Sequence, residues 1–91
     1  MPILRIINRG VGWETYHAIN AKVDIEHRHP LGLIMHGASE VGGTVQIAQV
    51  WDSEEYARRY DEEILKPALK LAGAPIDAEI YTFELLHLVT P

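Results

Sequence analysis

The sequence predicts an α+β fold in which a four-stranded antiparallel sheet carries two helices on one face. Two observations lead to this prediction: the periodic segments follow the order β-α-β-β-α-β, and the loops between them are short. Two consecutive strand–helix–strand halves with short connections fold into one sheet with both helices on the same side. The chain has 91 residues and no internal repeat or linker, so we expect residues 1–91 to form a single domain.

The first half of the chain begins with a strand and a helix. Residues 3–8 (ILRIIN) are rich in β-branched side chains and precede an Arg-Gly pair, which is typical of a short buried strand. Residues 11–29 carry apolar side chains at Tyr16, Ile19 and Val23, with polar residues between them. This spacing indicates a helix, and the proline and glycine that follow should end it.

A hairpin is predicted next, because residues 33–41 and 44–51 are two strand-like segments separated only by Gly42 and Gly43. Both central positions of the favoured two-residue turn need positive φ, which glycine adopts without strain. The length of such a turn fixes the register of the two strands. The hairpin therefore predicts which side chains face each other across it.

The predicted register places three polar or aromatic side chains on one face. With a two-residue loop, His36 faces Gln49 and Ile34 faces Trp51. Side chains alternate across a strand, so His36, Gln49 and Trp51 share a face. A histidine with an ordinary pKa of about 6.5 can transfer a proton near neutral pH, and a glutamine can fix its tautomer. The indole offers a flat wall for an aromatic ligand, although simple core packing would also place these residues here.

The second half of the chain predicts a helix and a last strand. Asp52 should cap the helix, with Glu55 in the position of a capping box. Pro67 should kink or break this helix, and a glycine ends it at position 73. Residues 77–90 (DAEIYTFELLHLVT) form the predicted last strand.

A homodimer is expected from the composition. The chain is 47% hydrophobic and has no cysteine for a disulfide, and small domains with these features are often stabilised by oligomerisation. His87 is placed on the last strand. In the sheet order 4-1-3-2 this strand lies about 14 Å from the strand of His36, so the two histidines could meet only across a dimer.

Several classes of function are disfavoured by composition. The formal charge is -5 and the Lys and Arg residues are scattered, which argues against nucleic acid as a partner. The absence of cysteine excludes a disulfide framework and fits a cytoplasmic location. No signal peptide or membrane helix is expected, because apolar segments fall short of the ~20 residues that a membrane helix needs. His27 and His29 are interpreted as a solvated helix end rather than a metal site.

Three segments of the sequence resemble the dimeric α+β barrel superfamily: VWDSEEY after the third strand, LKPALKLAG at the end of the second helix, and the closing FELLHLVTP. Within it, the chain is most similar to small bacterial proteins related to antibiotic-biosynthesis monooxygenases. The resemblance covers the whole chain and implies a ferredoxin-like fold, a dimeric barrel and a pocket between sheet and helices. The activities it implies include cofactor-independent oxygenation of aromatic polyketides, haem degradation, polyketide cyclisation, lactone isomerisation and dye-decolourising peroxidation.

Only part of the superfamily's functional residues are matched. Asn8 and Trp51 correspond to the asparagine and tryptophan of the haem-degrading branch, but its iron-ligating histidine on the second helix is missing. The histidine that plant polyketide cyclases carry near the end of this helix is missing too. The quinone-forming monooxygenases use asparagine, tryptophan and tyrosines without metal or flavin, and Tyr16, Tyr56 and Tyr60 make that pattern available.

We therefore predict a small cofactor-independent enzyme, monooxygenase-like or isomerase/cyclase-like, that acts on an aromatic or polycyclic small molecule. His36 is expected to transfer a proton, and the residues expected to bind the ligand are Trp51, Gln49, Tyr16, Asn8 and His87. No cofactor or metal is expected. Two alternatives stay open: a non-catalytic small-molecule-binding or accessory protein of the same fold, and a haem binder with His36 or His87 as ligand.

Overall fold

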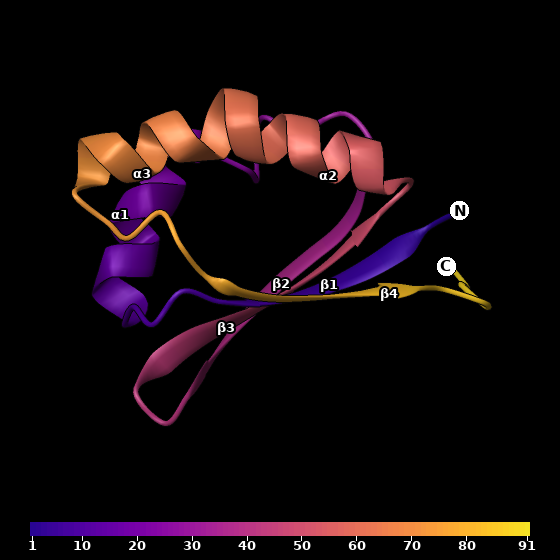
Figure 1. Ribbon diagram of the computed structural model, residues 1–91, viewed down its shortest axis with the longest axis horizontal. Coiled ribbons are helices and arrows are strands. Elements are labelled where there is room, and N and C mark those ends of the chain that lie inside the picture. The colour runs from indigo at the N-terminus through magenta and orange to yellow at the C-terminus, as the bar shows by residue number, and fades with distance from the viewer.

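The computed structural model describes residues 1–91 and confirms the predicted α+β architecture (Figure 1). The four strands form one antiparallel sheet in the order β2-β3-β1-β4, which is the predicted order. The helices lie together over one face of this sheet, and the two chain ends lie near each other at one end of it (Figure 1). The elements are β1 (Ile3–Asn8), α1 (Trp13–Val23), β2 (Leu33–Val41), β3 (Thr44–Trp51), α2 (Glu54–Tyr60), the π-helical segment η1 (Asp61–Leu65), α3 (Lys66–Ala72) and β4 (Glu79–Glu84).

The hydrophobic core lies between the sheet and the helices. Trp51 from β3 and Leu69 from α3 are its two largest fully buried side chains. Their packing removes apolar surface from water, which is the main favourable term in folding. Nine of the buried residues form one contiguous cluster: Ile3, Ile19, Val23, Ile25, Trp51, Ala57, Tyr60, Ala68 and Leu69.

The hairpin forms as predicted at its turn and differs at its far end. Gly42 and Gly43 both have positive φ, 59° and 86°, and His36 pairs with Gln49 as expected. At the start of β2, however, Leu33 rather than Ile34 faces Trp51, because a β-bulge inserts one extra residue there. The prediction that Ile34 faces the indole is therefore wrong.

Helix α1 is shorter than predicted, because it ends at Val23 instead of continuing to residue 29. Asp24 adopts the left-handed conformation at φ 54°, and its N–H bonds to the carbonyl of Asn20, which is a usual way to terminate a helix. Ile25 then turns back into the core as a buried residue. Hydrophobic spacing alone did not reveal this stop. The stop depends on Asp24, because aspartate adopts the left-handed region more readily than most residues.

The second helical region is capped by Ser53, so the predicted Asp52 capping box is wrong. Ser53 Oγ accepts a hydrogen bond from the N–H of Tyr56 at 3.5 Å, while the N–H of Asp52 is tied to the carbonyl of Gly32. Pro67 does not break the helix, because the π-helical segment precedes it and the proline falls in the first turn of α3. None of the helices combines the length and apolar character needed to cross a membrane.

Strand β4 ends at Glu84, well short of the predicted end at residue 90. The last ladder-like bond runs from the N–H of Leu85 to the carbonyl of Pro2, next to the start of β1. Beyond this point β1 has almost no backbone left to pair with. His87 therefore lies outside the sheet in an exposed segment, which corrects its predicted place on the last strand.

Candidate functional site

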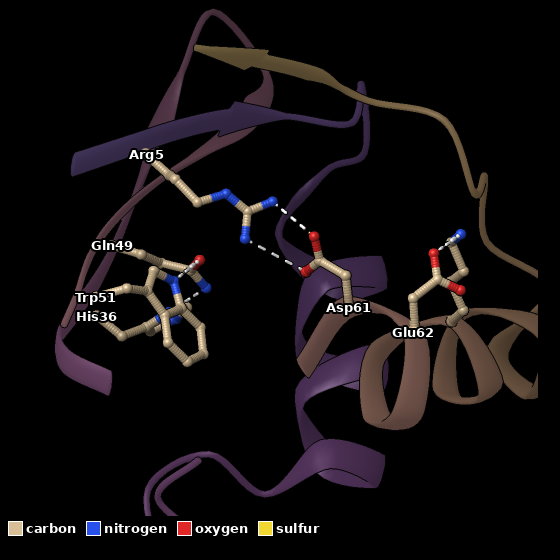
Figure 2. A network of polar contacts seen from close by, with 7 residues as sticks. Arg5, His36, Gln49, Trp51, Asp61 and Glu62 are labelled. Atoms are coloured by element: carbon tan, nitrogen blue, oxygen red, sulfur yellow. Dashed lines mark hydrogen bonds and ion pairs between the residues drawn. The ribbon is translucent and has the colours of Figure 1, made fainter. Parts of the chain in front are cut away.

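A chain of hydrogen bonds links the buried Trp51 to Gln49 and His36 on the helix-facing side of the hairpin (Figure 2). The indole Nε1–H of Trp51 donates to Oε1 of Gln49 at 2.9 Å. Nε2 of Gln49 lies 3.2 Å from Nδ1 of His36, and Nε2 of His36 lies 2.8 Å from the hydroxyl of Tyr16. The prediction that the hairpin register brings His36, Gln49 and Trp51 together is confirmed, and α1 adds Tyr16 to them.

The donor at one end of this chain sets the direction of every bond in it. An indole N–H can only donate, so the amide oxygen of Gln49 must face Trp51 and its NH₂ must face His36. Nδ1 of His36 is then an acceptor, and in the neutral ring Nε2 carries the proton. This Nε2–H donates to the oxygen of Tyr16, whose own O–H stays available to another acceptor.

The surroundings of His36 and Tyr16 keep both side chains uncharged. Burial lowers the pKa of His36, because the charged ring would be poorly solvated. Burial also raises the pKa of Tyr16, and the negative charge of Glu26 acts in the same direction. The Tyr16 phenol therefore remains protonated at neutral pH and can donate a hydrogen bond.

Two cavities meet at the hydrogen bond between Tyr16 and His36, since both residues line both cavities. The outer groove, about 440 Å³, lies between α1, the loop that follows it and β2. The inner cavity, about 40 Å³, lies between the sheet and the helices. The outer groove is also lined by Trp13, His17, Asn20, Ile25, Glu26, His29, Leu33, Ile34, Met35, Gly37 and Ala38.

Aromatic rings gather at the outer groove. The ring of Trp13 stacks on that of Tyr16 with centroids 5.3 Å apart, and the rings of Tyr16 and His36 are nearly parallel at 6.4 Å. His17 packs edge-on against Trp13. Flat aromatic faces in a groove of this size suit a planar ligand, and one protonated phenol fixes where a ligand oxygen would bind.

A second polar group lies beneath the helices and was not predicted from the sequence. Arg5 from β1 is almost fully buried and holds Asp61 of η1, with its Nη2 2.7 Å from Oδ2 (Figure 2). Tyr60 and Arg9 lie beside this ion pair and line the inner cavity. The available signal was Arg5 itself, because a charged residue alternates there with buried Ile3 and Ile7 along β1.

Two of the residues predicted to bind ligand, Asn8 and His87, lie away from His36, Gln49 and Trp51. Asn8 has the opposite parity to buried Ile7 on β1, and its side chain bonds the N–H of Gly10 at 2.9 Å. His87 is exposed beyond β4. Neither lines the outer groove or the inner cavity, and the fully buried Trp51 does not line them either, so its predicted role as a wall of the ligand pocket is not supported.

His27 and His29 are close in sequence, but their side chains do not point toward a common position for a metal ion. His27 Nδ1 bonds Oδ1 of Asp24 at 2.8 Å, and this hydrogen bond raises the pKa of His27. His29 instead lines the outer groove. No three metal-ligating side chains of the chain are clustered closely enough to hold an ion.

Comparison with known proteins places this architecture among solved structures. No family model matches the chain, and no curated protein matches it in sequence. A candidate antibiotic biosynthesis monooxygenase from Chloroflexus aurantiacus aligns with a TM-score of 0.71 at 12% identity, over 99% of this chain and 98% of that one. SnoaB, a cofactor-independent oxygenase from Streptomyces nogalater, aligns with a TM-score of 0.65 at 12% identity, over 99% and 96%.

The resemblance stated from the sequence is thus confirmed at the level of fold: antibiotic biosynthesis monooxygenase-like proteins share this ferredoxin-like architecture. A de novo designed protein also aligns, with a TM-score of 0.56 at 18% identity over 92% of this chain and 97% of that one. The same fold therefore occurs in an oxygenase and in a designed chain. Function has to be argued from the site rather than from the fold.

Proposed function

We propose that this protein binds a planar aromatic or polycyclic small molecule in the outer groove and acts on it without a cofactor. The observation that carries the proposal is the directed chain of hydrogen bonds that ends at Tyr16 in the groove wall. Its start at the buried Trp51 fixes the geometry of every member. A site held in this way from the core is preorganised, which is what catalysis by hydrogen bonding requires.

The chemistry that the site supports is polarisation of a ligand oxygen. Tyr16 accepts from His36 and keeps its own proton to donate to a carbonyl or an enolate. Stabilising an enolate is a step common to isomerisation, cyclisation and cofactor-independent oxygenation. It is also the kind of charge development for which a fixed donor in a site with little water is most effective.

His36 is proposed as the residue that orients Tyr16, and its proton-transfer role remains a prediction. While Gln49 donates to Nδ1 and Nε2–H donates to Tyr16, the ring has no free acceptor nitrogen. His36 could accept a proton only after its 3.2 Å bond to Gln49 opens. The same occupancy of both nitrogens favours the second candidate, a non-catalytic binding protein, over a haem binder.

The homodimer expected from composition has support in the outer face of the sheet. Tyr81 and Phe83 of β4 have the parity that points away from the helices, and each is about half exposed. Exposed apolar residues spread over one sheet face mark an interaction surface. We propose that a second copy of the chain covers this face and that the groove lies on the other side.

The test is enolisation of an aromatic ketone. With 2-tetralone in D₂O, solvent deuteroxide would remove a proton from the carbon next to the carbonyl while Tyr16 stabilises the enolate, and NMR would follow the deuterium that this carbon then takes up. The wild-type protein should accelerate exchange and Tyr16→Phe should reduce the acceleration at least tenfold, while Tyr81→Phe, which removes a phenol from the opposite face, should not change it. Binding without acceleration would favour the non-catalytic candidate. If neither this ketone nor any planar aromatic ketone, phenolate or carboxylate binds, the proposed function is wrong.

A further inference from the structure

Arg9 is a cation without a partner at the edge of the inner cavity. It follows directly after β1, and its Nε is buried with no hydrogen-bond acceptor. It makes no ion pair, because the nearby carboxylate of Asp61 is held by both terminal nitrogens of Arg5. Buried polar groups in native proteins are nearly always hydrogen-bonded, so this exception calls for an explanation.

The charges around Arg9 do not balance. Burial lowers the pKa of its guanidinium as the largest effect; Asp61 opposes the change, and Arg5 adds to it. Two arginines therefore lie near a single carboxylate, which pairs only with Arg5. Arg9 is half-buried, and an anion close to its buried Nε would supply both the missing charge and the missing hydrogen-bond acceptor.

The inner cavity has the composition of an oxyanion site. Its polar lining comes from Arg9, Tyr16, Asn20, His36, Gln49 and Tyr60, with no aspartate or glutamate among them. Burial keeps the phenol of Tyr60 protonated by raising its pKa, so it too can donate a hydrogen bond. The only formal charge on this lining is the positive charge of Arg9. The other lining residues are apolar.

The size of the cavity limits what can enter it. Its volume is about 40 Å³, and a cavity needs roughly 10–15 Å³ to hold a single water molecule. There is room for a carboxylate or a phenolate oxygen but not for an aromatic ring. A ring would remain in the outer groove, which meets the inner cavity at Tyr16 and His36.

We propose that Arg9 binds the oxyanion of a planar aromatic ligand, with the anionic oxygen in the inner cavity and the ring in the outer groove. This inference rests on the proposed function for the aromatic part of the ligand. It adds the charge class: a singly anionic aromatic carboxylate or phenolate. It also adds Arg9 as the residue that selects this class over neutral compounds.

The test compares two probes of the same shape, 2-naphthoate and its neutral analogue 2-naphthamide, with dissociation constants measured by calorimetry. The wild-type protein should bind naphthoate at least tenfold more tightly, as expected for a charge-assisted hydrogen bond. Arg9→Gln should abolish this preference, and Arg58→Gln, which removes an exposed arginine of α2, should preserve it. Equal binding of the two probes to wild type, or a preference that survives in Arg9→Gln, would overturn the proposal.

A second arm separates this inference from the proposed function and does not depend on a variant. The Nε–H signal of Arg9 in the wild-type NMR spectrum should shift on addition of sodium acetate and stay in place with sodium chloride at the same ionic strength. If neither naphthyl probe binds but acetate still shifts this signal, the anion site stands and the aromatic function fails. If naphthoate does not bind and acetate has no effect, the anion site is refuted.

Discussion

Replacing Gln49 with glutamate should reverse the protonation behaviour of His36. The amide NH₂ of Gln49 donates to Nδ1 of His36 and so favours the bare nitrogen. A carboxylate at this position can still accept the indole N–H of Trp51, but toward His36 it can only accept. In Gln49→Glu we therefore expect Nδ1 to take up a proton and the pKa of His36 to rise.

The size of the effect follows from the 3.2 Å separation between residue 49 and the ring. An opposite charge within about 4–6 Å changes a proton affinity by roughly ten- to a thousandfold, which corresponds to about 1.4–4 kcal/mol between the two protonation states. Residue 49 is 3% exposed, so solvent screens the pair little. Gln46→Glu is the matched control, because it adds the same charge to β3 on the exposed outer face.

The pH dependence of stability should change sign with this substitution. In the wild type the pKa of His36 is lowered by burial, so the unfolded chain holds the proton more tightly and His36 reduces the free energy of unfolding as pH falls below about 6.5. In Gln49→Glu, His36 should stabilise the fold at low pH and lose that contribution as pH rises through its new pKa.

The assay is NMR of the histidine ring nitrogens across pH, together with urea unfolding at several pH values. Gln46→Glu should leave the His36 titration at its wild-type position. If the pKa of His36 in Gln49→Glu equals that in the wild type, or falls, the assigned direction of the hydrogen bonds is wrong.

Three further substitutions test other parts of the structure. Gly32→Ala should lower the free energy of unfolding by at least ~2 kcal/mol in urea, because Gly32 has φ +85° and a Cβ would lie 2.4 Å from the ring of Tyr56; a loss below about 0.5 kcal/mol would argue against this contact. Arg5→Met should cost about 3 kcal/mol by the same measurement and more than Arg5→Met with Asp61→Asn, because the single change leaves a partly buried carboxylate unpaired; the reverse order would refute this reasoning. Phe83→Asp should shift the protein from dimer to monomer in size-exclusion chromatography with light scattering, and a wild-type chain that is already monomeric would contradict the proposed dimer.

Local signals in the sequence were sufficient for the strands and their order. The glycine pair at 42 and 43 set the turn and therefore the pairing of His36 with Gln49, which is the basis of the site. Periodicity could not locate the ends of elements that depend on other segments. β4 stops where β1 runs out of backbone, and the bulge at the start of β2 moves Leu33 opposite the indole.

The candidate site was only half visible in the sequence, because part of it is built by contacts across the fold. Tyr16 could be proposed only as a pocket wall, and its bond to His36 depends on how α1 crosses the hairpin. The positive inner cavity depends on η1, which brings Asp61 to Arg5 and leaves Arg9 unpaired. Arg5, a charged residue at an inward position of β1, was the one sequence signal for the ion pair beside this cavity.

The most direct test of the central claim is the NMR signature of the His36 ring in the wild-type protein, with and without planar aromatic ketones. We expect a neutral ring with the proton on Nε2 that resists protonation below pH 6.5, and a change in its signals when a ketone occupies the groove beside Tyr16. A ring that carries its proton on Nδ1, or that ignores every such ligand, would contradict it.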